Sequence, residues 1–236
     1  MFLMQINTLF FILLMVGFGL TVFSLVGLVI YVVRYVNKSG EDKVKIFNEL
    51  NQNAHRQGIV FLGDSLTEFY PADEFFYGCD VYNRGIAGDT TDGVLARLES
   101  NVLVLEPKKL FLQIGTNDLG KKKSPEDTFE NIKKIIETIQ SRLPETELYV
   151  ISLYPVNPKA TPYSKSMMLG RKNTDIRAIN CWLNDYCKTH QIPYLDVASA
   201  ITDENGLLKK EYTIEGLHIS FLGYSAITEV LKPYVN

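Results

Sequence analysis

The stretch Gly58-Ile59-Val60-Phe61-Leu62-Gly63-Asp64-Ser65 decides the fold of this chain. A short apolar run bounded by turn residues is typical of a strand that is buried on both faces of a sheet. The polar residues Asp64 and Ser65 follow this run directly, so they predict a turn that exposes a hydroxyl at the end of the strand. We therefore expect a buried strand that leads straight into a candidate site.

Four further apolar runs have the length and the residue types of buried strands, at 80–83, 109–114, 148–153 and 192–197. Helical patterns lie between and after them, at 91–103, 124–143, 173–190 and 221–234. The second of these has the clearest start signal, with Ser124 as N-cap and Pro125 at the first helical position. Strands that alternate with helices predict an α/β architecture, in which a parallel sheet is covered on both faces.

The N-terminal segment 1–36 predicts a transmembrane anchor. No charged side chain occurs before Arg34, and the apolar run that starts at Leu9 is longer than the ~20 residues that a helix needs to cross a bilayer. A cleaved signal peptide fits less well, because no basic region precedes the run and no small-residue cleavage site follows it. Within 37–57 we expect a linker over 37–42 followed by a short lead-in helix over 43–55, and we expect one globular domain over 58–236.

The charge pattern around this span predicts its orientation. Four basic residues follow the apolar run, whereas only the α-amino group precedes it. The positive-inside rule then predicts a single-pass membrane protein whose domain lies in the cytoplasm. The basic residues are Arg34, Lys38, Lys43 and Lys45.

The composition argues against several other classes of function. The formal net charge of -3 gives no basic field for nucleic acid. The three cysteines, Cys79, Cys181 and Cys187, lack CxxC spacing and a neighbouring histidine cluster, which argues against a zinc site. Their odd number also argues against a disulfide framework, so we expect free, buried thiols.

Four short segments hold residue types that acyl-transfer chemistry needs. Three of them follow predicted strands, and ligands of parallel α/β sheets bind beyond the carboxyl ends of the strands. We therefore expect Ser65, Gly88 and Asn117 to meet at one edge of the sheet, with His218 reaching that edge from the loop before the last helix. The segments are Gly63-Asp64-Ser65-Leu66, Gly85-Ile86-Ala87-Gly88-Asp89, Gly115-Thr116-Asn117-Asp118 and Glu215-Gly216-Leu217-His218.

Each segment alone has a simpler interpretation. Asp64 and Ser65 could cap a helix, Asn117 could form an Asx turn, and His218 could be an exposed loop residue. Together they supply a serine nucleophile, an imidazole base and, in Glu215, a carboxylate that could orient the imidazole. Stabilising a tetrahedral oxyanion needs preorganised donors. For these we choose the backbone N–H groups of residues 65 and 88 and the side-chain amide of residue 117.

The four segments resemble the sequence blocks of the SGNH (GDSL-type) hydrolase superfamily. Asn83-Arg84-Gly85-Ile86-Ala87-Gly88-Asp89-Thr90 is similar to the branch that contains platelet-activating-factor acetylhydrolase-like esterases. The similarity covers roughly residue 59 to the C-terminus. It implies a flavodoxin-like three-layer α/β/α sandwich with strand order 2-1-3-4-5 and no metal or organic cofactor.

The resemblance also implies roles for single residues. Ser65 corresponds to the nucleophile, His218 to the base, and Ser65, Gly88 and Asn117 to the oxyanion hole. One position departs from the pattern, because the family's usual aspartate three residues before the histidine is Glu215 here. The extra methylene must be accommodated by a changed loop or rotamer.

We expect a membrane-anchored serine esterase that acts on small or lipid-derived acyl esters through an acyl-enzyme. Deacetylation of a carbohydrate or of a cell-envelope polymer is an alternative within the same superfamily, since the fold does not choose the substrate. A catalytically silent ligand-binding module is an alternative of another class. The aromatic residues within 69–77 favour core packing, the long connection 154–170 could form a lid, and neither identifies the substrate or the oligomeric state.

Overall fold

The computed structural model describes residues 2–235, with side chains at 14–32, 34 and 38–235. The chain separates into two compact units, Met1–Asp42 and Lys43–Asn236. The boundaries that we expect from the sequence, with the anchor ending at residue 36 and the globular domain beginning after residue 57, stay a prediction.

A single long helix, α1 (Phe2–Asn51), begins the chain. The sequence predicted a linker over 37–42, and this prediction is wrong, because the helix continues through these residues. The segment contains one glycine and no proline, so its polar residues do not interrupt the helix on either side of it. The expected lead-in helix is thus the last part of α1.

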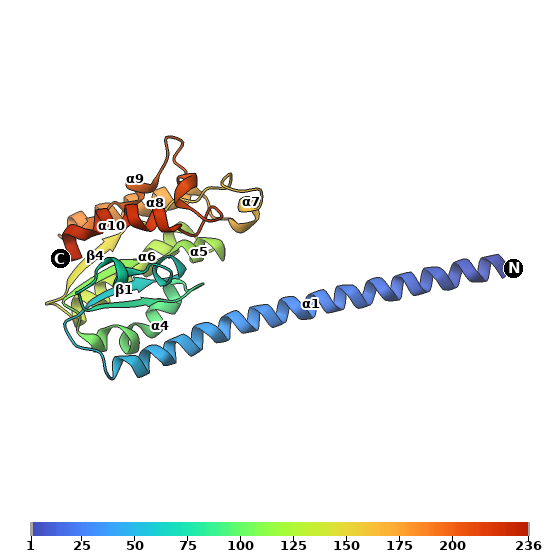
Figure 1. Ribbon diagram of the computed structural model, residues 1–236, viewed down its shortest axis with the longest axis horizontal. Coiled ribbons are helices and arrows are strands. Elements are labelled where there is room, and N and C mark those ends of the chain that lie inside the picture. Colours follow the sequence, from blue (N-terminus) through green and yellow to red (C-terminus); the bar gives the residue numbers. More distant parts are fainter. Residues whose placement is uncertain (1, 236) are drawn as a thin grey trace. The chain divides into compact units, whose positions relative to one another are not determined.

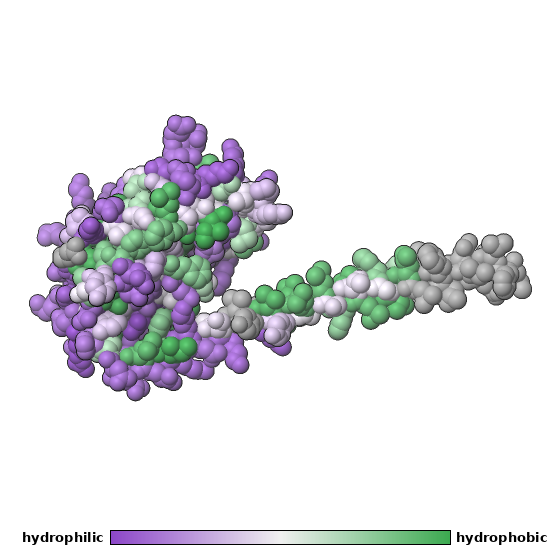
Figure 2. All heavy atoms as spheres, viewed as in Figure 1, coloured by the Kyte–Doolittle hydropathy of each residue, from purple (hydrophilic) through white to green (hydrophobic). Residues whose placement is uncertain are grey.

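The apolar part of α1 is long enough to cross a membrane. Leu14–Val32 has a mean hydropathy of 2.2, and none of it is buried within the protein. Figure 2 shows hydrophobic residues along the visible part of this helix. A signal sequence near the N-terminus would have the same length and composition.

The second unit is built on a five-stranded sheet in which every pair of neighbouring strands is parallel. The strand order β2-β1-β3-β4-β5 confirms the predicted topology. Its strands are β1 (Ile59–Gly63), β2 (Val81–Gly85), β3 (Lys109–Gln113), β4 (Glu147–Ile151) and β5 (Tyr194–Leu195). The edge strand β5 is shorter than expected, because Pro193 cannot donate to the ladder and Asp196 already caps the next helix.

The four predicted helices of this unit are confirmed within two residues at each end. They are α4 (Thr91–Asn101), α6 (Pro125–Arg142), α8 (Asn173–Thr189) and α10 (Phe221–Val235). At the start of α6, the Ser124 hydroxyl accepts the Asp127 N–H at 3.0 Å, as the capping pattern predicted. Short helical turns make up the rest, namely α2 (Ser65–Glu68), α3 (Ala72–Phe75), η1 (Leu103–Leu105), α5 (Thr116–Gly120), α7 (Ser164–Met167), α9 (Val197–Ile201) and η2 (Lys210–Tyr212).

Alternate residues of the central strands face two separate hydrophobic cores. Val60 and Leu62 pack with α4, α6 and α8 on one side of the sheet. Ile59 and Phe61 pack with α2, α3, α9 and α10 on the other side. Figure 1 shows α4 and α10 on opposite sides of the sheet. This arrangement confirms the three-layer sandwich, and it leaves the carboxyl ends of the strands to carry the site.

The cysteines differ from the expectation in their burial. All three are free, but only Cys187 is buried, whereas Cys79 is partly exposed and Cys181 is exposed on α8. The prediction of buried thiols is therefore wrong for two of them. Cys79 lies in the connection between α3 and β2, and Cys181 lies on the exposed side of α8.

Candidate active site

Ser65 lies in the turn between β1 and α2. The strand ends at Gly63, where a Cβ would lie 2.2 Å from the Gln113 carbonyl oxygen of β3, so only glycine fits. Asp64 is the N-cap of α2 and accepts the Leu66 N–H at 2.9 Å. Asp64 therefore caps the helix, as its simpler interpretation predicted. Ser65 is the first residue of that helix, and its hydroxyl is directed at His218.

The imidazole of His218 joins Ser65 to Glu215. Its Nε2 lies 3.1 Å from the Ser65 Oγ, and its Nδ1 lies 2.5 Å from Glu215 Oε1. The same carboxylate oxygen accepts the backbone N–H of His218 at 3.2 Å. A carboxylate on Nδ1 fixes the tautomer whose Nε2 can accept the serine proton. Ser65 and His218 are 153 residues apart in the chain, yet with Glu215 they form one hydrogen-bonded row.

A tightly closed loop brings Glu215 and His218 together. Thr213 and Ile219 pair across its base, and the Thr213 hydroxyl donates to the His218 carbonyl at 2.7 Å. Gly216 between them has a φ of +99°, and a Cβ there would lie 2.2 Å from the Asn157 carbonyl oxygen. Only glycine tolerates both constraints. The loop thus has room for the longer glutamate side chain to fold back onto the imidazole.

Gly88 lies opposite in a turn after β2. The Asp89 N–H closes the turn on the Ile86 carbonyl at 3.1 Å, and Gly88 has a φ of +79° with open space beside its Cα. Within residues 2–235, the backbone N–H groups of Ser65 and Gly88 have no hydrogen-bond acceptor. Both donors are therefore free to bind an incoming oxygen.

The Asn117 carboxamide lies beside the same two loops. Its Nδ2 donates to the Asp89 carbonyl at 2.9 Å and to Asp64 Oδ2 at 3.3 Å. Its Oδ1 accepts an N–H of Arg171 at 2.7 Å. The structure thus brings all five predicted site residues to one edge of the sheet, with the nitrogen of Asn117 toward the serine turn.

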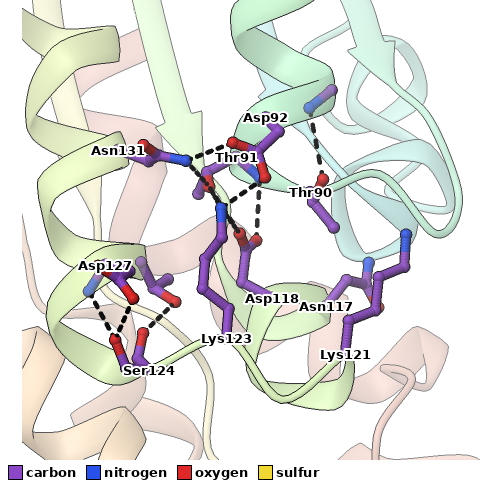
Figure 3. A network of polar contacts seen from close by, with 12 residues as sticks. Thr90, Thr91, Asp92, Asn117, Asp118, Lys121, Lys123, Ser124, Asp127 and Asn131 are labelled. Atoms are coloured by element: carbon purple, nitrogen blue, oxygen red, sulfur yellow. Dashed lines mark hydrogen bonds and ion pairs between the residues drawn. The ribbon is translucent and has the colours of Figure 1, made fainter.

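Asp118 belongs to a separate structural network (Figure 3). This buried carboxylate accepts the backbone N–H of Thr91 at 2.9 Å and the Thr91 hydroxyl at 2.6 Å, and it pairs with Lys123 at 3.2 Å. Asn131 of α6 donates to the same hydroxyl at 3.0 Å. The network fixes α5 against α4 and α6, and so it holds the neighbouring Asn117 in place.

The sequence match agrees with this geometry. Residues 61–226 match the GDSL-like Lipase/Acylhydrolase family. The chain belongs to this family. The resemblance predicted from the four motifs is thereby confirmed, and ester hydrolysis is the general chemistry of such a hydrolase.

Several relatives of this GDSL-like hydrolase cover most of its length. Platelet-activating factor acetylhydrolase IB subunit alpha1 from Bos taurus is 29% identical over 178 residues, which span 73% of this chain and 72% of that protein. A solved structure from Streptococcus pneumoniae, described as a platelet activating factor, is 32% identical with a TM-score of 0.82, covering 88% and 98% of the two chains. A GDSL-like lipase from Bacteroides thetaiotaomicron, at 24% identity and a TM-score of 0.71, shares the fold over 81% of this chain and 96% of that chain.

Two charged residues that the sequence motifs did not point to contact the candidate site of this hydrolase. Arg171 contacts Asn117, and Glu68 accepts the Ala87 N–H next to Gly88 at 2.5 Å while pairing with Lys43. Both are charged residues without a local pattern, so only the folded chain reveals their partners. Within the part of the chain that the structure describes, no group of three or more His, Cys, Asp or Glu side chains could hold a metal ion.

The aromatic residues that follow Ser65 differ in their burial. Tyr70 and Phe76 are buried in the core, as expected for most of them. Phe69 is 49% exposed, and its ring centroid lies 5.5 Å from that of His218. It therefore borders the site, whereas Tyr77, at 94% exposure, belongs to neither group.

Asp64 is the titratable group most strongly affected by this environment. Burial raises its pKa to about 7, and the nearby Asp89 and Asp118 act in the same direction. The Leu66 N–H and the Arg171 guanidinium oppose this rise. The carboxyl group next to Ser65 therefore has a pKa in the neutral range.

We expect the stability of the hydrolase to depend on pH through Asp64. In an unfolded chain this carboxyl ionises near pH ~4, so between about 4 and 7 the folded state binds more protons and the free energy of unfolding falls as pH rises. The loss amounts to at most about 4 kcal/mol. Urea unfolding of wild type and Asp64→Asn across this range measures it, because the variant should gain stability relative to wild type with rising pH.

The same substitution at the exposed Asp73 is the control for this measurement. A stability difference between wild type and Asp64→Asn that stays constant from acid to neutral pH would contradict the expected titration of Asp64.

Proposed function

We propose that this protein is a serine esterase that cleaves carboxylic esters of small or lipid-derived substrates through an acyl-enzyme. The hydrogen-bonded row Ser65–His218–Glu215 carries the proposal. His218 takes the Ser65 proton as the Oγ attacks the ester carbonyl, and it returns that proton to the leaving alcohol. Water then attacks the acyl-enzyme with His218 again as base, which releases the acid and regenerates the serine.

The proposed oxyanion hole consists of the Ser65 N–H, the Gly88 N–H and the Asn117 Nδ2. Two of these donors are free in the structure. The third, Asn117 Nδ2, donates to the Asp89 carbonyl and more weakly to Asp64 Oδ2, and it would exchange the weaker of these bonds for one to the oxyanion. A donor of this kind lowers the barrier by roughly 3 kcal/mol, because it meets the charge that develops in the transition state. The negative Glu215 meanwhile stabilises the imidazolium that forms on the other side of the serine.

The substrate class rests on two observations. The half-exposed ring of Phe69 next to His218 offers an apolar contact for an ester group. The relatives from Bos taurus and Rattus norvegicus are named as acetylhydrolases, which favours a short acyl group here. A carbohydrate or cell-envelope O-deacetylase would share the acetyl group but not the apolar contact.

We expect Ser65→Ala to abolish ester turnover and labelling by a fluorophosphonate probe, because no other group in the row can form the acyl-enzyme. Ser225→Ala on α10 is the matched control and should keep both. Hydrolysis of p-nitrophenyl esters of increasing chain length, beside acetylated sugars, then separates the esterase from the O-deacetylase. A folded wild-type protein that neither turns over an ester nor reacts with the probe would indicate a silent binding module instead.

Glu215→Gln should lower kcat by about a hundredfold to ten-thousandfold, less than the loss caused by Ser65→Ala. The glutamine keeps the shape of the side chain but removes the charge that stabilises the imidazolium, and its amide can present a donor to Nδ1. Glu211→Gln, in the same region but exposed, is the control. Near-normal kcat of Glu215→Gln would assign the orienting role to another group.

We further propose that residues 1–36 anchor the esterase in a membrane as a single span. The apolar Leu14–Val32 supports this, and the basic residues Arg34, Lys38, Lys43 and Lys45 after it favour a cytoplasmic domain. Protease added to sealed right-side-out membrane vesicles should leave the domain intact and should degrade it in inverted vesicles. Degradation in right-side-out vesicles would reverse the orientation, and release of the protein from membranes at alkaline pH would exclude the anchor.

A further inference from the structure

Arg171 lies at the end of the long connection 154–170, outside all four sequence motifs, and is only 9% exposed. Its guanidinium donates hydrogen bonds to two different parts of the chain. The Nε donates to the Thr116 carbonyl at 3.0 Å and one terminal nitrogen donates to Asn117 Oδ1 at 2.7 Å. The other terminal nitrogen donates to the Met168 carbonyl at 3.2 Å, at the end of α7. Arg171 thus joins the connection to the segment that carries Asn117.

These contacts determine which way the Asn117 carboxamide points. A carboxamide has a donor end and an acceptor end of nearly equal shape, so it can rotate by half a turn unless its partners distinguish the ends. Arginine can only donate, so it selects the oxygen, and the Asp89 carbonyl can only accept, so it selects the nitrogen at 2.9 Å. After half a turn, the amide nitrogen would face the Arg171 donor and the amide oxygen would face the Asp89 carbonyl, so both hydrogen bonds would be lost. The oxygen would then point toward the developing oxyanion and repel it.

The charge of Arg171 acts in the same direction. Burial lowers the pKa of its guanidinium and the Asp64 carboxylate offsets part of this effect, while an arginine stays protonated in proteins. A buried cation on Oδ1 polarises the amide and strengthens its N–H as a donor. The guanidinium also opposes the negative charge of Asp64 below the nucleophile.

We propose that Arg171 is a positioning residue of the esterase, which holds the Asn117 carboxamide with its N–H toward the oxyanion and ties the connection 154–170 to the oxyanion hole. The inference rests on the proposed function. Arg171 makes no hydrogen bond to Ser65, so its main effect on acyl transfer should pass through Asn117, with a smaller effect through the charge of Asp64. The effect should therefore fall on kcat rather than on KM.

A double-mutant cycle with Asn117→Ala tests this dependence. We expect Arg171→Ala to lower kcat by about tenfold to a hundredfold with little change in KM, since it weakens but does not delete an oxyanion donor. In an Asn117→Ala background the same substitution should change kcat by less than about twofold. Arg177→Ala on α8 is the matched control, because Arg177 is exposed and makes no hydrogen bond or ion pair within residues 2–235.

A second variant moves the guanidinium without removing it. Gly120 of α5 packs against Arg171, and a Cβ there would lie 2.5 Å from its Cζ. Gly120 is helical, so Gly120→Ala strains no backbone and displaces only the end of a flexible side chain. We expect it to lower kcat and to lose this effect in the Asn117→Ala background. This variant decides the question if Arg171→Ala does not fold.

Rescue with a small cation distinguishes positioning from general stability. Guanidinium ion at low concentration should restore part of the kcat of Arg171→Ala, and it should leave Asn117→Ala unchanged. Equal losses of kcat with and without Asn117, or a loss confined to KM, would overturn the role of Arg171 while the esterase proposal stands. A wild-type protein without ester turnover would overturn the esterase proposal itself.

Discussion

Three aspartates close to Ser65 constrain the whole site. Asp64, Asp89 and Asp118 follow β1, β2 and β3 within five residues of each strand end; Asp64 and Asp118 are buried, and the Asp89 side chain is 11% exposed. A buried carboxylate is costly unless it is paired or hydrogen-bonded, so each one recruits a partner from another element. Asp89 binds Arg97 at 2.8 Å, Asp118 binds Thr91, and Asp64 takes the Leu66 N–H. Satisfying these groups fixes the three loops that carry Ser65 and the proposed oxyanion donors.

This constraint explains why much of the fold and the site could be predicted. The apolar runs marked the strands, and in a parallel sheet the residues after neighbouring strands must meet at one edge. Ser65, Gly88 and Asn117 therefore converge whatever the details of their turns. The closeness of Glu215 and His218 needed only a short loop, and Gly216 supplies the backbone conformation that closes it. Spacing along the chain was enough for each of these steps.

The parts that were missed depend on contacts between side chains far apart in sequence. Arg171 lies 54 residues from Asn117, and nothing in its surroundings distinguishes it from Arg177 six residues later. Burial of one and exposure of the other follow from where α7 and α8 pack, which periodicity does not encode. The linker expected over 37–42 is wrong for a different reason. Polar composition alone does not end a helix, and this segment holds no proline and only one glycine, Gly40, which weakens a helix without breaking it.

A negative side chain, Glu215, and a positive one, Arg171, lie on opposite sides of Ser65, where each would stabilise a charge that develops during the proposed ester cleavage. Attack on an ester would place positive charge on His218 and negative charge on the ester oxygen, on opposite sides of the serine. Glu215 lies on the imidazole side, at 2.5 Å from Nδ1, and Arg171 lies on the other side, behind the Asn117 amide. Asp64 lies under the serine itself, and its full ionisation there would oppose the negative charge. Its burial, which raises its pKa to about 7, weakens that opposition at and below neutral pH. The same burial that destabilises this carboxylate would therefore favour the transition state of the proposed ester cleavage.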